Sequence, residues 1–175
     1  LLSGYQVVIL GIRAFNTVEP LAYKNKILFD WVHEGGTMIV QYNVNRGLVT
    51  EELAPYPLSL SRDRVTEEHT PVTLLAPDHP VFSFPNKINT SDFEGWVQER
   101  GLYFPSTWDE HFTPLLQMND TGEAPTKGAL LVAQYGKGYY VYSGLSWFRH
   151  LPAGIPGAYR LLSNLIALGY KNGRS

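Results

Sequence analysis

Two short apolar segments on either side of a helical pattern constrain this fold more than any other feature of the sequence. Residues 5–10 read YQVVIL and residues 37–40 read TMIV. Such continuous apolar runs are typical of strands that are buried on both faces. Between them, apolar side chains recur on roughly one helical face, at Leu21, Ile27, Leu28, Trp31 and Val32. Strand, helix, Gly35-Gly36 and strand in this order predict a βαβ unit with a right-handed crossover.

The rest of the chain extends this unit into one predicted domain, residues 1–175. Hydrophobic residues make up 44% and charged residues 17%, which excludes disorder for the chain as a whole. Residues 129–135 and 139–143 flank a short glycine turn and predict a β-hairpin, and a last helix is predicted from residue 156 to residue 168. We therefore expect an α/β three-layer fold with a mostly parallel sheet and a C-terminal hairpin.

Composition also excludes several classes of function. The net charge of -2 argues against a nucleic-acid partner, and no apolar run reaches the length of about 18 residues that a membrane helix needs. The sequence contains no cysteine, so it has no disulfide, no iron–sulfur site and no thiol nucleophile.

The motifs that resemble catalytic or cofactor sites all have simpler explanations. Gly136-Lys137-Gly138 precedes a strand and not a helix, so it predicts a hairpin turn and not a phosphate loop. Ser146 lacks the glycine that a nucleophile elbow needs where Phe148 stands. Asp78 and His79 supply two metal ligands without a third, and we interpret them as part of a rigid turn. We assign no catalytic residue, no metal and no cofactor.

Polar side chains follow both predicted strands of the βαβ unit. Arg13 and Asn16 come after the first strand, and Gln41, Asn43 and Arg46 come after the second. Ligands of open parallel sheets bind at the carboxyl ends of the strands, so these five residues are our first candidates for a binding site. The alternative is that they only fix the backbone of their loops.

Four further residues extend the candidate site. Trp147 and Arg149 follow the last hairpin strand, and Glu99 and Arg100 are candidates for a wall. Aromatic rings cover the C–H faces of a sugar, and guanidinium and amide groups bond its hydroxyls. The sequence therefore predicts a carbohydrate or another polyhydroxylated small molecule as ligand. The alternative for the rings is that they belong to the core.

Several segments together resemble a known family. They are GIRAFN, QYN at residues 41–43, APDHP, WVQERGLYFP and the tail from YGKGYYVYSG to residue 169. They are similar to the domain at the C-terminus of some bacterial PIG-L/LmbE-like deacetylase proteins, which itself resembles class I glutamine amidotransferases and the ThuA-like group. The resemblance implies a flavodoxin-like sandwich. It also implies a partner, the zinc-containing domain of a parent protein that deacetylates N-acetylated sugars.

The chain departs from this family at both known active sites. No cysteine, serine or threonine stands at the elbow after residues 41–43, where the amidotransferases carry their nucleophile. Residues 76–80 read APDHP and only resemble the deacetylase zinc motif by composition. The first strand and helix usual in the family have no counterpart before Leu1, which fits a fragment of a longer protein.

Three hypotheses for the function follow. The first is a non-catalytic amidotransferase-like module that binds carbohydrate or docks against the deacetylase domain. The second is a hydrolase of N-acetylated or related sugars, with a carboxylate or metal site built on Asp78, His79 and Glu99. The third is a scaffold without a ligand. The missing cysteine favours the first.

The strand at residues 5–10 predicts one more property. It is apolar on both faces, as a strand with neighbours on both sides would be. We expect either that a second copy of the chain pairs with it, forming a homo-oligomer, or that a preceding segment of the parent protein does so.

Overall fold

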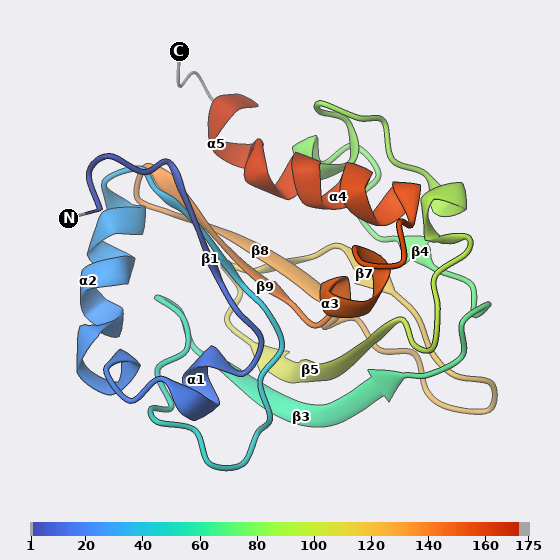
Figure 1. The fold of residues 1–175 in the computed structure, drawn as a ribbon, viewed down its shortest axis with the longest axis horizontal. Helices are drawn as coiled ribbons and strands as arrows, with labels where there is room; N and C mark the ends of the chain where they lie inside the picture. The colour runs from blue at the N-terminus through green and yellow to red at the C-terminus, as the bar shows by residue number, and fades with distance from the viewer. Residues whose placement is uncertain (1, 172–175) are drawn as a thin grey trace.

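A five-stranded sheet forms the centre of the protein (Figure 1). The computed structural model describes residues 2–171. The sheet has the order β1-β2-β9-β8-β6, with the bounds β1 Val7–Leu10, β2 Thr37–Val40, β9 Gly138–Ser143, β8 Leu130–Tyr135 and β6 Thr113–Pro114. The βαβ unit is present, because β1 and β2 are parallel and α2 (Leu21–His33) connects them. The predicted hairpin is present as the antiparallel pair β8 and β9.

The predicted flavodoxin-like sandwich with a mostly parallel sheet is nevertheless wrong. Only β1-β2 and β2-β9 are parallel, and the other four strand pairings of the described chain are antiparallel. The physical reason lies in the middle of the chain, where no helix long enough to connect parallel strands forms. This region instead makes two small antiparallel sheets, β3 (Leu58–Val65) with β5 (Gly101–Trp108) and β4 (Thr73–Leu74) with β7 (Leu116–Gln117).

The helices are few and mostly short. α2 has 13 residues and α4 (Pro156–Ile166) has 11, while α1 (Ala14–Thr17), α3 (Trp147–His150) and α5 (Leu168–Lys171) have four residues each. Two 3₁₀ turns, η1 (Pro80–Phe82) and η2 (Thr90–Phe93), lie in the aromatic-rich middle segment. No helix among residues 2–171 has both the length and the apolar character needed to cross a bilayer.

The sheet separates two hydrophobic clusters. Along β2, the side chains of Met38 and Val40 belong to the cluster beneath α2, while Ile39 belongs to the cluster beneath α4. Successive side chains of a strand point to opposite faces, so every residue of β2 is buried and the TMIV segment has no polar face. The same alternation places Tyr140 and Tyr142 of β9 under α2 and Val141 under α4.

The end of α2 approaches the turn before β9 closely. A Cβ atom at Gly138 would lie 2.0 Å from the carbonyl oxygen of Val32 and 2.2 Å from that of Gly36. The same approach lets the backbone N–H of Tyr139 donate to Gly36 over 3.1 Å. Only glycine fits at this position, because both obstacles are backbone atoms.

We therefore expect Gly138→Ala to lower the free energy of unfolding by about 2 kcal/mol or more, because the backbone must move apart. Chemical denaturation measures the loss. Gly11→Ala is the matched control, since a Cβ there meets nothing within 4 Å. Equal stabilities of the two variants would contradict this packing.

Strand β1 lies at the edge of the sheet. Within residues 2–171 it pairs only with β2, and Ile9 is 43% exposed. The expected second neighbour is thus not supplied by the described chain. The edge has no proline or charged side chain to discourage pairing, so its pairing with another strand remains a prediction.

If second copies pair through β1, light scattering will show a molecular mass that rises with protein concentration. Ile9→Lys should then return the mass to that of the monomer, because a charged side chain disfavours edge pairing. Ile27→Lys adds the same charge on an exposed position of α2 and should leave the mass unchanged. A monomer mass at every concentration would exclude the second copy as the partner.

Candidate functional site

The loops after β1 and β2 meet at the carboxyl edge of the sheet, as the strand-end rule predicts (Figure 1). The backbone N–H of Arg13 donates to the carbonyl oxygen of Tyr42 over 2.8 Å. Arg13 has a φ of 58°, in the left-handed region that residues other than glycine seldom adopt. The short helix α1 begins directly after it.

Asn43 joins these loops to the centre of the sheet. Its fully buried side chain accepts a hydrogen bond from the N–H of Phe15 over 2.9 Å and donates to the carbonyl oxygen of Gln41 over 3.0 Å. Its backbone N–H donates to the hydroxyl of Tyr142 over 3.1 Å. Burial raises the pKa of that hydroxyl, so Tyr142 stays neutral and hydrogen-bonded.

Asn16 and Gln41 also bond to backbone. The side chain of Asn16 accepts from the N–H of Val44 over 2.8 Å and donates to its carbonyl oxygen over 2.9 Å. Gln41 donates to the carbonyl oxygen of Leu10 over 3.1 Å. Three of the five predicted binding residues, Asn16, Gln41 and Asn43, therefore fix the loops, which is the alternative the sequence left open.

The other two, Arg13 and Arg46, line a cleft of about 480 Å³ together with Val44, Asn45, Arg62 and Tyr103. We call it the arginine cleft. Its three arginines are exposed, and their guanidinium groups have no hydrogen bond or ion pair with any residue of the described chain. Arg62 was missed by the sequence analysis; its only signal was the charged run at residues 61–64.

A β-bulge places Arg62 at this cleft. Leu60 pairs with Pro105 and Asp63 with Phe104, so residues 61 and 62 of β3 have no partners of their own in β5. The hydroxyl of Ser61 donates to the carbonyl oxygen of Phe104 over 2.7 Å and accepts from the N–H of Asp63 over 3.0 Å. Such bulges redirect side chains and are common beside binding sites.

A row of half-buried rings leads away from the cleft. Tyr42 lies 6.3 Å from Tyr103 and 5.7 Å from Phe148, measured between ring centroids. The guanidinium group of Arg149 lies 5.0 Å from the centroid of Phe148. Rings from β5, the loop after β2 and helix α3 thus form one aromatic surface beside the arginine cleft.

The remaining predicted residues have protein partners. Arg149 forms an ion pair with Glu99, with 2.6 Å between Nε and Oε1. Arg100 is 5% exposed and donates to the carbonyl oxygens of Thr70, over 2.8 Å, and Phe93. Trp147 is 2% exposed and donates to the hydroxyl of Ser143 over 3.0 Å. Arg100 and Trp147 therefore belong to the interior rather than to a ligand-facing wall.

His150, which follows Arg149, is fully buried. Its ring centroid lies 4.2 Å from that of Trp96. Its Nε2 lies 3.0 Å from the carbonyl oxygen of Glu99, and its Nδ1 accepts from the N–H of Val97 over 3.4 Å. This pattern fits the neutral ring with the proton on Nε2. Burial is the main cause that lowers the pKa of His150 to about 4.

The contribution of His150 to the free energy of unfolding should therefore decrease as the pH falls from 6.5 to about 4. In this window the unfolded chain binds a proton at His150 that the folded protein does not. The slope is at most about 1.4 kcal/mol per pH unit for one such group. Burial also lowers the pKa of His79, which adds to the effect. An NMR titration that found an ordinary midpoint of 6.5 for the His150 ring would contradict the lowered pKa of His150.

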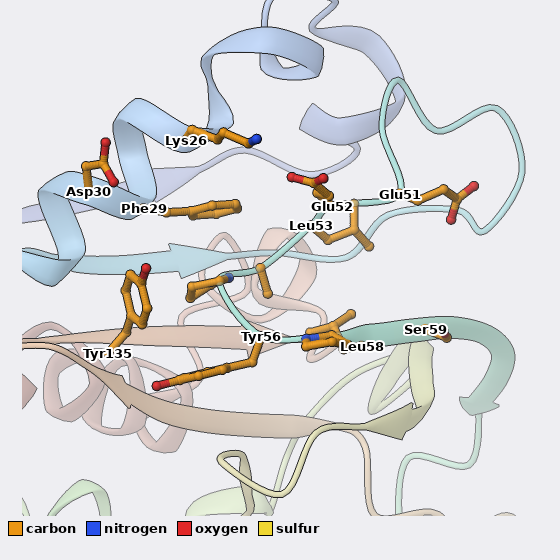
Figure 2. A pocket seen from close by; sticks show the side chains of 13 residues that line it. Lys26, Phe29, Asp30, Glu51, Glu52, Leu53, Tyr56, Leu58, Ser59 and Tyr135 are labelled. Atoms are coloured by element: carbon orange, nitrogen blue, oxygen red, sulfur yellow. The ribbon is translucent and has the colours of Figure 1, made fainter.

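A second cavity of about 580 Å³ lies beside α2 (Figure 2). Figure 2 shows Lys26 and Phe29 above it and Tyr56 and Tyr135 below it. Its lining residue Tyr135 pairs with Gly138 at the start of β9. Its charged groups have both signs, whereas those of the arginine cleft have one. Of these two cavities, only the arginine cleft is lined by candidate residues from the strand ends, Arg13 and Arg46.

The residues of the hydrolase hypothesis do not assemble. The Nδ1 atom of His79 accepts from the N–H of Val81 over 3.1 Å and caps η1, while Glu99 pairs with Arg149. Within residues 2–171, no three histidine or acidic side chains gather in a way that could hold a metal ion. Ser146 is fully buried at the start of α3.

No protein-family model and no curated protein sequence matches this chain. Solved structures do resemble it. The cytoplasmic proteins STM3548 of Salmonella typhimurium and STM1381 of Salmonella typhimurium LT2 are 13% and 14% identical, with TM-scores of 0.58 and 0.57. Each match covers 94% of this chain and 72% of the other.

A beta-galactosidase from Rahnella sp. R3 is 14% identical with a TM-score of 0.51, and the match covers 97% of this chain but 23% of the enzyme. At such low identities the similarity concerns the fold alone. None of these names points to the ThuA-like or PIG-L/LmbE proteins that we expect from the sequence. The chain thus shares a fold with two cytoplasmic proteins and with a part of a larger enzyme.

Proposed function

We propose that this domain is a non-catalytic binding module that holds a small polyhydroxylated molecule, such as a carbohydrate derivative, in the arginine cleft. The observation that carries the proposal is the set of unpaired side-chain donors at the carboxyl edge of the sheet. The half-buried rings of Tyr42 and Tyr103 lie beside these donors and suit the C–H faces of a sugar.

The lining of the cleft supports binding without chemistry. It contains three arginines, an asparagine, a valine and a tyrosine, and no histidine, carboxylate, serine or threonine. Hydrolysis of an amide or a glycosidic bond needs a nucleophile or a pair of acid and base groups within reach of the substrate. This cleft offers no such pair, so we favour the binding module over the hydrolase. The deacetylase-type parent and its partner domain rest on the sequence resemblance alone.

NMR spectra of the labelled domain, titrated with sugars and sugar derivatives, test the proposal. Amide signals of residues 11–16, 44–47 and 103 should shift together on binding. Tyr103→Leu should weaken binding about fivefold or more because it removes a ring from the site, as seen for aromatic contacts elsewhere. Tyr56→Leu, in the cavity beside α2, is the matched control and should have no effect.

The domain should also release no ammonia from glutamine and no acetate from N-acetylglucosamine, since no group at the cleft performs either step. Turnover above that of a heat-inactivated sample would contradict the non-catalytic assignment. Shifts confined to residues around Tyr56 would instead move the site to the other cavity.

A further inference from the structure

The arginines of this protein fall into two groups. Seven of them lie in the described chain. Arg149 pairs with Glu99, Arg160 pairs with Asp92 over 2.8 Å, and Arg100 donates to backbone carbonyls. Arg64 lies close enough to Asp120 to help lower the pKa of that carboxyl, whose main hydrogen-bond donors are Glu67 and Thr66. The three without such a partner are Arg13, Arg46 and Arg62, and all three line the arginine cleft.

The grouping of three arginines at one cleft is electrostatically unfavourable when no ligand is bound. Three like charges face one cleft whose lining contains no carboxylate, in a protein whose net charge is -2. Like charges at close range repel each other, and solvent only reduces the repulsion. A cleft lined by charges of one sign concentrates ions of the opposite sign. The arrangement therefore suits an anion that enters from outside.

Each of the three arginines is held by a different part of the fold. The left-handed backbone of Arg13 is fixed by its hydrogen bond to Tyr42. The carbonyl oxygen of Arg46 accepts from the side chain of Asn16 over 3.2 Å. Arg62 stands in the bulge of β3. These contacts fix the backbone at three points, far apart in sequence, from which the guanidinium groups extend. Unusual backbone conformations such as that of Arg13 are frequent at ligand sites.

We propose that the ligand of the arginine cleft carries a compact oxyanion, a phosphate or a carboxylate, which Arg13, Arg46 and Arg62 bind together. The inference rests on the proposed function and names the chemical class of its ligand. Guanidinium groups present paired N–H donors that match the oxygens of both anions. The uncharged part of the ligand then lies toward the rings of Tyr103 and Tyr42.

Titration calorimetry with four probes tests this inference: glucose, glucuronate, glucose 6-phosphate and inorganic phosphate. The better of the two anionic sugars should bind at least about tenfold more tightly than glucose, because charge-assisted hydrogen bonds are stronger than neutral ones. Comparison of glucuronate with glucose 6-phosphate decides between carboxylate and phosphate. The ratio of the affinity for the anionic sugar to the affinity for glucose should decrease as salt is added.

Arg62→Gln should weaken binding of the preferred anionic sugar about tenfold, and should weaken binding of glucose by a smaller factor. Arg46→Gln is a second, independent variant with the same expected result. Arg64→Gln removes the same charge from the same strand near Asp120 and should change the affinity less than about twofold. Without ligand, Arg62→Gln should not lower the melting temperature, because it relieves repulsion. An equal loss of affinity in Arg64→Gln would overturn the inference.

The outcomes separate the inference from the proposed function. If glucose binds as tightly as both anionic sugars, the binding module stands and the anion inference fails. If inorganic phosphate binds as tightly as glucose 6-phosphate, the anion inference stands and the polyhydroxylated ligand fails. If none of the four probes binds, both are overturned.

Discussion

The hydrogen bonds of Asn43 are the constraint on which the rest of the site depends. Its buried side-chain amide bonds to the start of α1 and to Gln41 after β2, and its backbone N–H donates to the hydroxyl of Tyr142 in β9. Because the group is fully buried, removal of any partner would leave a polar atom unpaired, at a cost of about 1–3 kcal/mol. The network therefore holds two loops from separate strands in one arrangement, and Arg13 and Arg46 extend from those loops into the same cleft.

The local patterns of the sequence predicted the first unit and the last hairpin correctly. A continuous apolar run at residues 37–40 and a glycine turn at residues 136–138 both describe structure that forms between near neighbours in the chain. The middle of the chain followed no such pattern. β3 carries Arg62, Asp63 and Arg64, and its register against β5 slips several times, so neither alternation nor helical spacing marked it as a strand. The prediction of a mostly parallel sheet is wrong because the strand-helix-strand pattern does not continue through this region, whose strands pair antiparallel.

The difference between local patterns and contacts distant in sequence also explains which residues of the candidate site could be predicted. Arg13 and Arg46 could be predicted because the end of a parallel strand has a fixed place at the sheet edge. Arg62 could not, because its position depends on a bulge stabilised by a hydrogen bond from Ser61 to Phe104, 43 residues away. Sequence likewise could not decide which asparagines bind backbone, since an amide in a loop serves a ligand or a carbonyl equally well. The sequence predicts Trp147 at the sheet edge and Arg100 in a wall of the site, whereas both side chains are buried in the interior of the domain.

A crystal structure of the domain grown with glucose 6-phosphate tests the central claim most directly. We expect the phosphate in the arginine cleft, within hydrogen-bond distance of at least two of Arg13, Arg46 and Arg62, with the sugar ring toward Tyr103. A phosphate bound only elsewhere, with the three guanidinium groups facing solvent, would contradict it.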